Sequence, residues 1–265
     1  MEQPPIVITY DNAPTESSNF FFETCTRNGW VVKHIGLGEN WEGFTNKIKA
    51  YAQICIELPP DQIVVISDAR DVLCVRPPKA FTEAFHEFKG NIVVSTELLC
   101  DGSFESSEEV PHIQCYPLHK YYNIRNIKPG IRKYINSGLI AGRAKSIADM
   151  WTWILENKFT DDQFGVCKYA VAFPERIELD LHASLLHSST FGVNAGIQSI
   201  HIQKQDSPTF AELMGCGAFF LHIPGNKNKG QLHIYNMVKL CLEKYSSNHL
   251  LELYKYPIPK WNEIF

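Results

Sequence analysis

The sequence predicts an α/β protein with a mostly parallel central sheet and helices on both of its faces. Short β-branched apolar runs alternate with segments of helical period along the first hundred residues, and this order is typical of parallel sheets. The 265 residues are 45% hydrophobic and 20% charged, a globular composition that excludes disorder as the main state. A chain of this length buries about 70–75% of its unfolded surface, so its core needs no disulfide or metal.

Four strands are expected in the first hundred residues, because four short runs of β-branched or aliphatic side chains are bounded by turn residues. They cover residues 6–10, 30–35, 62–67 and 91–95. The segments between them carry apolar side chains at helical spacing and end at capping residues or glycine. They predict helices over residues 18–28, 45–56 and 78–88.

The pattern is less regular in the rest of the chain. Residues 100–130 lack periodicity, so they are expected to form a loop that is functional or mobile. A helix is expected at 146–157, and Thr160 is expected to cap a second one with Gln163 at the capping-box position. Further strands are expected at 177–179, 199–203 and 218–221, and a last helix at 231–245.

Charge and hydropathy exclude several classes of protein. The net charge of -4 argues against a nucleic-acid binder that acts through a general basic field. No apolar run approaches the roughly 18 residues of a membrane span, and the first residues lack the basic and apolar regions of a signal peptide. A cytoplasmic location is therefore expected. The eight cysteines form no CxxC pair and are expected to be free thiols.

Two carboxylates, Asp68 and Asp71, directly follow the strand at 62–67. Ligands of such sheets bind beyond the carboxyl ends of the strands. Two neighbouring oxygen ligands suit a hard cation such as Mg²⁺ or Mn²⁺ that also binds phosphate. The alternative is that Asp68 caps a turn and Asp71 pairs with Arg70 or another basic residue at the surface.

A second polar group follows the apolar strand at 218–221. His222 suits a metal through a neutral ring nitrogen, and Gly225 allows the backbone to approach a phosphate. Lys227 and Lys229 carry compact charges that suit phosphate oxygens. The alternative is a surface loop with solvated lysines and a histidine at the edge of the core.

Two other segments are candidate binding elements. Trp41 lies in a loop after the second strand, where it would either stack on a flat base or cover the core. Residues 134–142 place Asn136, Ser137 and Gly138 between apolar runs. This composition suits close approach of the backbone to a ligand, or a β-bulge.

Asp161 and Asp162 form an acidic pair at the expected start of a helix. They suit acceptors for sugar hydroxyls or a catalytic base. The alternative is that they only stabilise the start of the helix, by about 0.3–1 kcal/mol.

The order of these segments resembles the glycosyltransferase domain of the procollagen lysyl hydroxylases and, more distantly, other GT-A fold sugar-nucleotide transferases such as the glycogenin group. The matching segments are Asn40-Trp41-Glu42-Gly43, Asp68-Ala69-Arg70-Asp71, residues 134–142, Asp161-Asp162-Gln163, Leu179-Asp180 and residues 222–229. Each motif is weak by itself, and six motifs in the family's order are a strong signal.

The resemblance implies a single GT-A type, Rossmann-like domain over residues 1–265. It implies a nucleotide-binding half at about 1–100, a mobile loop at about 100–130, and a half at about 131–265 that completes the metal site and binds the acceptor. The activity it implies is transfer of a hexose or pentose from a UDP-sugar to a hydroxyl of a glycan or glycoprotein, with Mn²⁺ or Mg²⁺ as cofactor.

The resemblance also implies a role for each candidate residue. Asp68, Asp71 and His222 would hold the metal, Trp41 would contact the uracil, and Asn136 and Asp162 would face the sugar and the acceptor. Ser137, Gly138, Gly225, Lys227 and Lys229 would complete the donor site. The candidates for the catalytic base are Asp162, Asp161 and Asp180.

Two rival functions remain open at this point. A nucleotidyltransferase on a similar sheet would attack the α-phosphate and release pyrophosphate, although no Gly-rich basic signature follows the first strand. A non-catalytic relative would only bind a nucleotide or sugar. UDP-galactose, UDP-glucose and UDP-xylose are all compatible donors.

Overall fold

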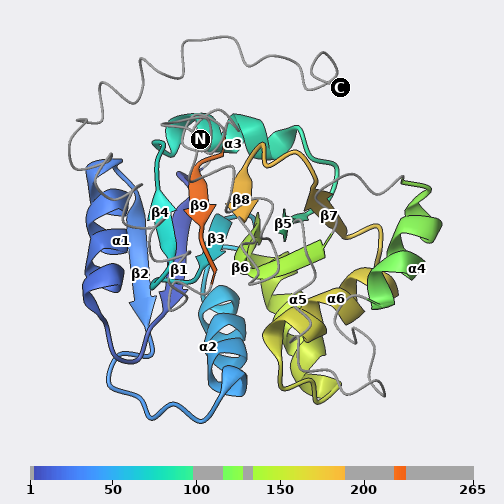
Figure 1. The fold of residues 1–265 in the computed structure, drawn as a ribbon, viewed down its shortest axis with the longest axis horizontal. Coiled ribbons are helices and arrows are strands. Elements are labelled where there is room, and N and C mark those ends of the chain that lie inside the picture. Colours follow the sequence, from blue (N-terminus) through green and yellow to red (C-terminus); the bar gives the residue numbers. More distant parts are fainter. Residues whose placement is uncertain (1–2, 98–115, 128–133, 189–217, 225–265) are drawn as a thin grey trace, which may run out of the picture.

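The computed structural model describes residues 3–97, 116–127, 134–188 and 218–224 (Figure 1). The strands are β1 (Ile6–Tyr10), β2 (Val31–Ile35), β3 (Ile63–Ser67), β4 (Val72–Cys74), β5 (Ile92–Glu97), β6 (Tyr134–Arg143), β7 (Ile177–Asp180), β8 (Leu186–Ser188) and β9 (Phe220–His222). The helices are α1 (Glu16–Arg27), α2 (Phe44–Ile56), α3 (Lys79–His86), α4 (Tyr116–Arg125), α5 (Ala144–Glu156) and α6 (Asp162–Ala172).

The strands form one sheet in the order β2-β1-β3-β6-β5-β8-β9-β4, and β7 also pairs with β5. Most neighbouring strands are parallel, as the sequence predicts. The exceptions are β6, which is antiparallel to β3 and β5, and β4, which is antiparallel to β9. Because β6 runs against its two neighbours, it brings its own residues to the edge where β3 ends.

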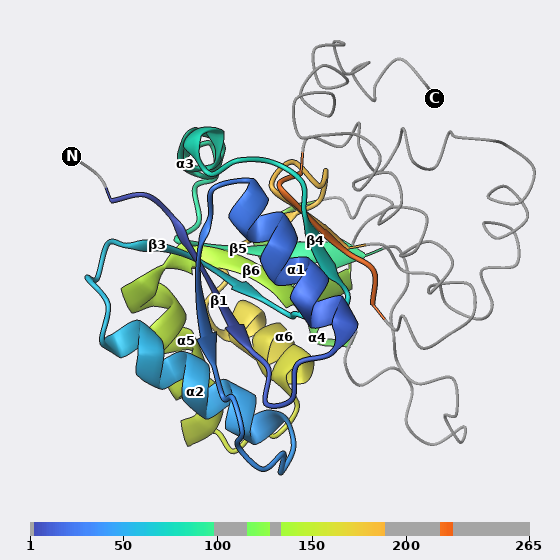
Figure 2. The ribbon, with the colours of Figure 1, turned by 90° about the vertical axis from the view of Figure 1, so that its left-hand side faces the viewer.

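Both faces of the sheet are covered by helices, which confirms the predicted layers. Figure 2 shows α2 and α5 on one side of the strands and α3 on the other. Along β1, Ile6 and Ile8 belong to the core that includes Tyr51 and Trp151, whereas Val7 belongs to the core that includes Phe21. A strand that is buried on both faces has a continuous apolar run, and this is the pattern from which the strand was predicted.

The four strands and three helices expected before residue 97 are all present, with bounds within three residues of those predicted. The three-residue strands β4 and β8 were not predicted, since they are too short to carry a periodicity. The expected strand at 199–203 and the expected helix at 231–245 lie outside the described residues, and the division into two halves stays a prediction.

The expectation of a loop throughout residues 100–130 is wrong for α4, which is helical from Tyr116 to Arg125. Its buried side chains include Leu118, Tyr121 and Tyr122, which have the i, i+3, i+4 spacing of a helix face. The tyrosine hydroxyl of Tyr121 donates to the carbonyl of Ile177, so the helix is held against β7. The polar neighbours in the sequence conceal this short apolar face.

The described cysteines agree with the expectation of free thiols, since Cys25, Cys55, Cys74 and Cys167 are all unbonded and buried. Burial raises the pKa of the Cys55 thiol to about 12. Within the described parts of the chain, no helix has both the length and the hydropathy that a membrane crossing requires.

Candidate active site

Three side chains with metal-ligating atoms meet at one edge of the sheet. Asp68 directly follows β3, Asp71 directly precedes β4, and His222 is the last residue of β9. Antiparallel pairing of β4 with β9 sets Val72 opposite His222, and the amide of Ile223 donates to the carbonyl of Asp71 at 2.8 Å. The backbone therefore brings together residues that are far apart in the sequence.

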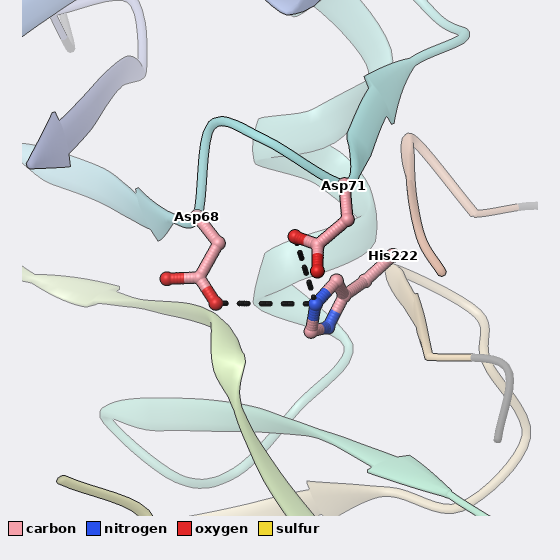
Figure 3. Close-up of side chains that lie close together, drawn as sticks. All are labelled: Asp68, Asp71 and His222. Carbon is pink, nitrogen blue, oxygen red and sulfur yellow. Dashed lines mark ion pairs between the residues drawn. The ribbon is translucent and has the colours of Figure 1, made fainter. Parts of the chain in front are cut away.

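The ligating atoms of Asp68, Asp71 and His222 all lie within 4.8 Å of one another. Figure 3 shows the imidazole of His222 directed at both carboxylates, with Nε2 3.3 Å from Asp71 Oδ1 and 3.9 Å from Asp68 Oδ2. Two carboxylate oxygens and one imidazole nitrogen are a donor set that suits Mn²⁺ or Mg²⁺. The residues thus fit the divalent cation that the sequence predicts.

Asn136 sets the orientation of the His222 ring. Its Oδ1 lies 2.8 Å from His222 Nδ1 and also accepts a hydrogen bond from the amide of Gly138 at 2.9 Å. Its Nδ2 donates to Glu97 Oε2 at 3.3 Å. Because Oδ1 is an acceptor, Nδ1 of a neutral His222 carries the proton, and Nε2 presents its lone pair to the cation site.

The charges around His222 favour a cation at this place. Burial by itself lowers the pKa of His222, but the nearby carboxylates of Asp71, Asp68 and Glu97 raise it, and the resulting pKa lies above its ordinary value. Carboxylates that favour an imidazolium equally favour a bound metal ion.

Gly138 gives the site the space that it needs. A Cβ atom at this position would lie 2.2 Å from His222 Cε1 and 2.9 Å from Asp68 Oδ2. The carbonyl of Gly138 also accepts a hydrogen bond from the amide of Asp68 at 2.9 Å. The backbone at Gly138 therefore lies close to both candidate metal-ligating side chains, whereas its approach to a bound donor stays a prediction.

The segment that contains Asn136 and Gly138 also departs from regular strand pairing, in agreement with the β-bulge that its sequence offered as the alternative. The register between β5 and β6 shifts between Val94 and Thr96, whose partners on β6 are Ile140 and Ile135. Asn136 and Gly138 lie in the stretch of β6 between these two pairs. The hydroxyl of Ser95 donates to the carbonyl of Asn136 at 2.9 Å.

The helix start at the acidic pair is one residue later than predicted. Asp161, not Thr160, is the N-cap of α6, and its Oδ1 accepts a hydrogen bond from the amide of Phe164 at 2.7 Å. Thr160 lacks this role because the helix begins at Asp162. Gln163 contacts the site, since its Oε1 accepts a hydrogen bond from the amide of Ser137 at 3.3 Å.

Asp162 and Lys47 form a buried ion pair that also includes Asp68. The ammonium nitrogen of Lys47 lies 2.7 Å from Asp162 Oδ2 and 2.6 Å from Asp68 Oδ1. Burial lowers the pKa of Lys47, but Asp162 and Asp68 outweigh it and the pKa lies well above its ordinary value. A lysine on α2 therefore connects the candidate base with a candidate metal ligand.

Lys47 is not among the site residues predicted from the sequence, although its position on α2 carries a signal. Lys47 lies beside Ile48 and four residues before Tyr51, both fully buried, so it falls on the apolar face of α2. A charged residue is almost never fully buried unless it is paired. Its position therefore predicts an acidic partner.

Asp180 has a structural role in this arrangement. It is the last residue of β7, and its carboxylate accepts hydrogen bonds from the amides of Ser184, Leu185 and Leu186. These bonds order the turn that leads into β8. The geometry thus favours Asp162 over Asp180 as the candidate base.

Trp41 is 48% exposed, which disagrees with the alternative that it covers the core. Its ring packs edge-on against Phe44 with centroids 5.6 Å apart, and the centroid of the Tyr10 ring lies 6.0 Å away. The Phe44 ring in turn lies 6.0 Å from the ammonium group of Lys47. A half-exposed indole is thus connected to Asp68 through only two side chains.

We expect Trp41→Ala to weaken binding of UDP by about 1–3 kcal/mol, the size of a base–aromatic stacking contact. The melting temperature should change little, because nearly half of the side chain is exposed. Isothermal titration with UDP and Mn²⁺ and a thermal melt measure the two effects. A large drop in melting temperature with unchanged affinity of the folded protein would contradict the stacking role.

Gly225, Lys227 and Lys229 lie outside the described residues, so their predicted contacts with phosphate stay predictions.

A family model described as the PLOD GT domain matches residues 2–207, which is most of the chain. The chain belongs to the PLOD GT domain family. The PLOD glycosyltransferase assignment agrees with the resemblance seen in the order of the sequence motifs. A search of curated proteins finds no match.

Solved structures with similar folds share little sequence with this PLOD GT domain. A glycosyltransferase involved in the glycosylation of the major capsid of PBCV-1 has 12% identity and a TM-score of 0.46, over 87% of this chain and 100% of that chain. A 4-diphosphocytidyl-2C-methyl-D-erythritol synthase from Anaerococcus prevotii DSM 20548 has 10% identity and a TM-score of 0.41, over 70% and 87% of the two chains. These likenesses are too distant to assign a substrate.

Proposed function

We propose that this glycosyltransferase moves a sugar from a UDP-sugar to a hydroxyl of a glycan or glycoprotein, with Mn²⁺ or Mg²⁺ as cofactor. The observation that supports the proposal most directly is the cluster of Asp68, Asp71 and His222, in which Asn136 turns Nε2 of His222 toward the two carboxylates. A cytoplasmic location stays a prediction from the sequence.

The mechanism rests on stabilising the leaving group. A divalent cation held in this site would supply positive charge for the diphosphate as its bond to the anomeric carbon breaks. Asp68, Asp71 and His222 would hold this cation at rigid strand ends. Trp41 would hold the uracil, and Ser137, Gly138, Gly225, Lys227 and Lys229 are the remaining predicted contacts of the donor.

Asp162 is the proposed acceptor of the proton that leaves the attacking hydroxyl. Its Oδ1 accepts a hydrogen bond from the amide of Gln163 at 2.9 Å, and its Oδ2 is bound to Lys47. Each carboxylate oxygen has a second lone pair, so both can accept a further hydrogen bond. The carboxylate of Asp161 caps the N-terminus of α6. Asn136 is better described as a residue that positions His222 than as a contact of the sugar.

Product analysis tests the proposed reaction against its two rivals. The protein is incubated with UDP-galactose, UDP-glucose or UDP-xylose and Mn²⁺, without acceptor, and the phosphate-containing products are separated. Slow release of UDP is expected from at least one donor. A parallel incubation with UTP and the matching sugar 1-phosphate tests the nucleotidyltransferase, which would release pyrophosphate from the UTP. Binding of a UDP-sugar without product in either mixture would indicate a non-catalytic module.

We expect UDP to stabilise the protein against heat when Mn²⁺ is present, and much less when a chelator replaces it. A ligand at 100 times its dissociation constant adds about 2.7 kcal/mol to the free energy of unfolding. This increase is readily measured as a shift in melting temperature. Equal shifts with metal and with chelator would rule out a metal-dependent donor site.

A further inference from the structure

Lys47 contacts both a candidate metal ligand, Asp68, and the proposed catalytic base, Asp162. Its ammonium group bonds to Asp68 Oδ1, whereas the other oxygen of that carboxylate, Oδ2, is the one that faces His222. The same ammonium bonds to Asp162 Oδ2. The ammonium group of Lys47 therefore joins the candidate metal ligand Asp68 to the candidate base Asp162.

The ammonium group of Lys47 is buried and, among the described residues, has few other polar groups to contact. The side chains of Lys47 and Asp162 are 7% and 6% exposed, so water has little access to this pair, whereas the Asp68 side chain is 32% exposed. The rings of Phe44 and Tyr51 lie 6.0 Å and 5.9 Å from the nitrogen. A buried charge that is paired with two carboxylates and has two aromatic rings nearby is expected to keep its place.

We propose that Lys47 is a positioning residue whose charge links the cation site to Asp162 and weakens binding of the cation itself. It holds Asp162 in place and shares Asp68 with the divalent cation. Its positive charge repels that cation, because only the carboxylate group of Asp68 would separate the two charges. This role of Lys47 rests on the metal site of the proposed function and does not depend on which UDP-sugar is the donor.

The proposal predicts that removing Lys47 has opposite effects on metal binding and on turnover. Without Lys47, Asp68 and Asp162 both become uncompensated negative charges near the cation site. Lys47→Met, which keeps the length of the side chain, should therefore bind Mn²⁺ alone roughly tenfold more tightly. Release of UDP should slow at the same time, because Asp162 loses the group that holds it.

The first experiment is a titration of Mn²⁺ alone, without nucleotide, into the wild-type protein and into Lys47→Met. Lys49→Met is the matched control, because Lys49 is exposed on the same helix two residues away. It should bind Mn²⁺ as the wild type does. A wild-type protein that binds no Mn²⁺ would overturn the proposed metal site, whereas weaker or equal binding by Lys47→Met would overturn the role of Lys47 alone.

A second set of variants keeps the test decisive if Lys47→Met does not fold. Asp162→Asn leaves the charge of Lys47 less compensated and should bind Mn²⁺ more weakly than the wild type. Adding Lys47→Met to Asp162→Asn should restore the affinity, and this double variant buries no unpaired charge at the two positions. Weaker binding in the double variant than in Asp162→Asn would contradict the proposal.

Discussion

A single methyl group added at Gly138 is expected to abolish binding of Mn²⁺ and the UDP release that depends on it. The added Cβ would lie 2.2 Å from His222 Cε1, 2.6 Å from His222 Nδ1 and 2.9 Å from Asp68 Oδ2. Atoms this close must move apart, and both side chains in their path are candidate metal ligands. Titration of Mn²⁺ into Gly138→Ala, followed by an assay of UDP release, measures the loss.

Gly142→Ala is the matched control on the same strand. Its Cβ would lie 2.9 Å from both the carbonyl oxygen of Asn91 and the Cδ1 atom of Ile147, so it should also lower the melting temperature. It touches no candidate ligand, and the folded protein should still bind Mn²⁺. If Gly138→Ala binds Mn²⁺ with wild-type affinity, His222 or Asp68 is not a ligand.

Asp162→Asn is expected to lower turnover by about 100-fold or more, the usual loss when a general base is removed. The affinity for UDP at saturating Mn²⁺ should stay near that of the wild type, because a group that acts in the transition state contributes little to donor binding. Asparagine has nearly the size of aspartate, so the packing around residue 162 is kept. Steady-state rates of UDP release and a UDP titration separate the two quantities.

Asp161→Asn is the control for the neighbouring carboxylate. Asn and Asp are comparable N-cap residues, so α6 should remain stable and turnover should be near normal. Wild-type turnover in both variants would remove the acidic pair from the mechanism. Loss in Asp161→Asn alone would move the base by one residue, against the observation that the Asp161 carboxylate caps the helix.

The sequence predicted the strands that carry the site because their signal is local. The run at β3 is apolar on both faces, and Asp68 could be placed at its carboxyl end from this run alone. His222 was placed in the same way at the end of β9. The helix α4 was missed because its apolar face is short, and the start of α6 was misplaced because Thr160 and Asp161 are both good capping residues.

The contacts between these residues could not be predicted in the same way. Lys47 and Asp162 are 115 residues apart, and His222 and Asn136 are 86 residues apart. Periodicity indicates which face of an element is buried, and it does not indicate which polar group lies opposite. Asp180 is an example. Its position at the end of an apolar strand suited a catalytic base, but in the structure its carboxylate accepts hydrogen bonds from three backbone amides.

The sequence by itself thus determined the α/β order, the helices on both faces and the positions of Asp68 and His222 at the ends of two strands. The tertiary structure decided that Asn136 orients His222, that Gly138 leaves room for it and that Lys47 joins Asp68 to Asp162. The physical reason is that buried polar groups must find partners. Those partners come from distant elements that only the packed sheet and helices bring together.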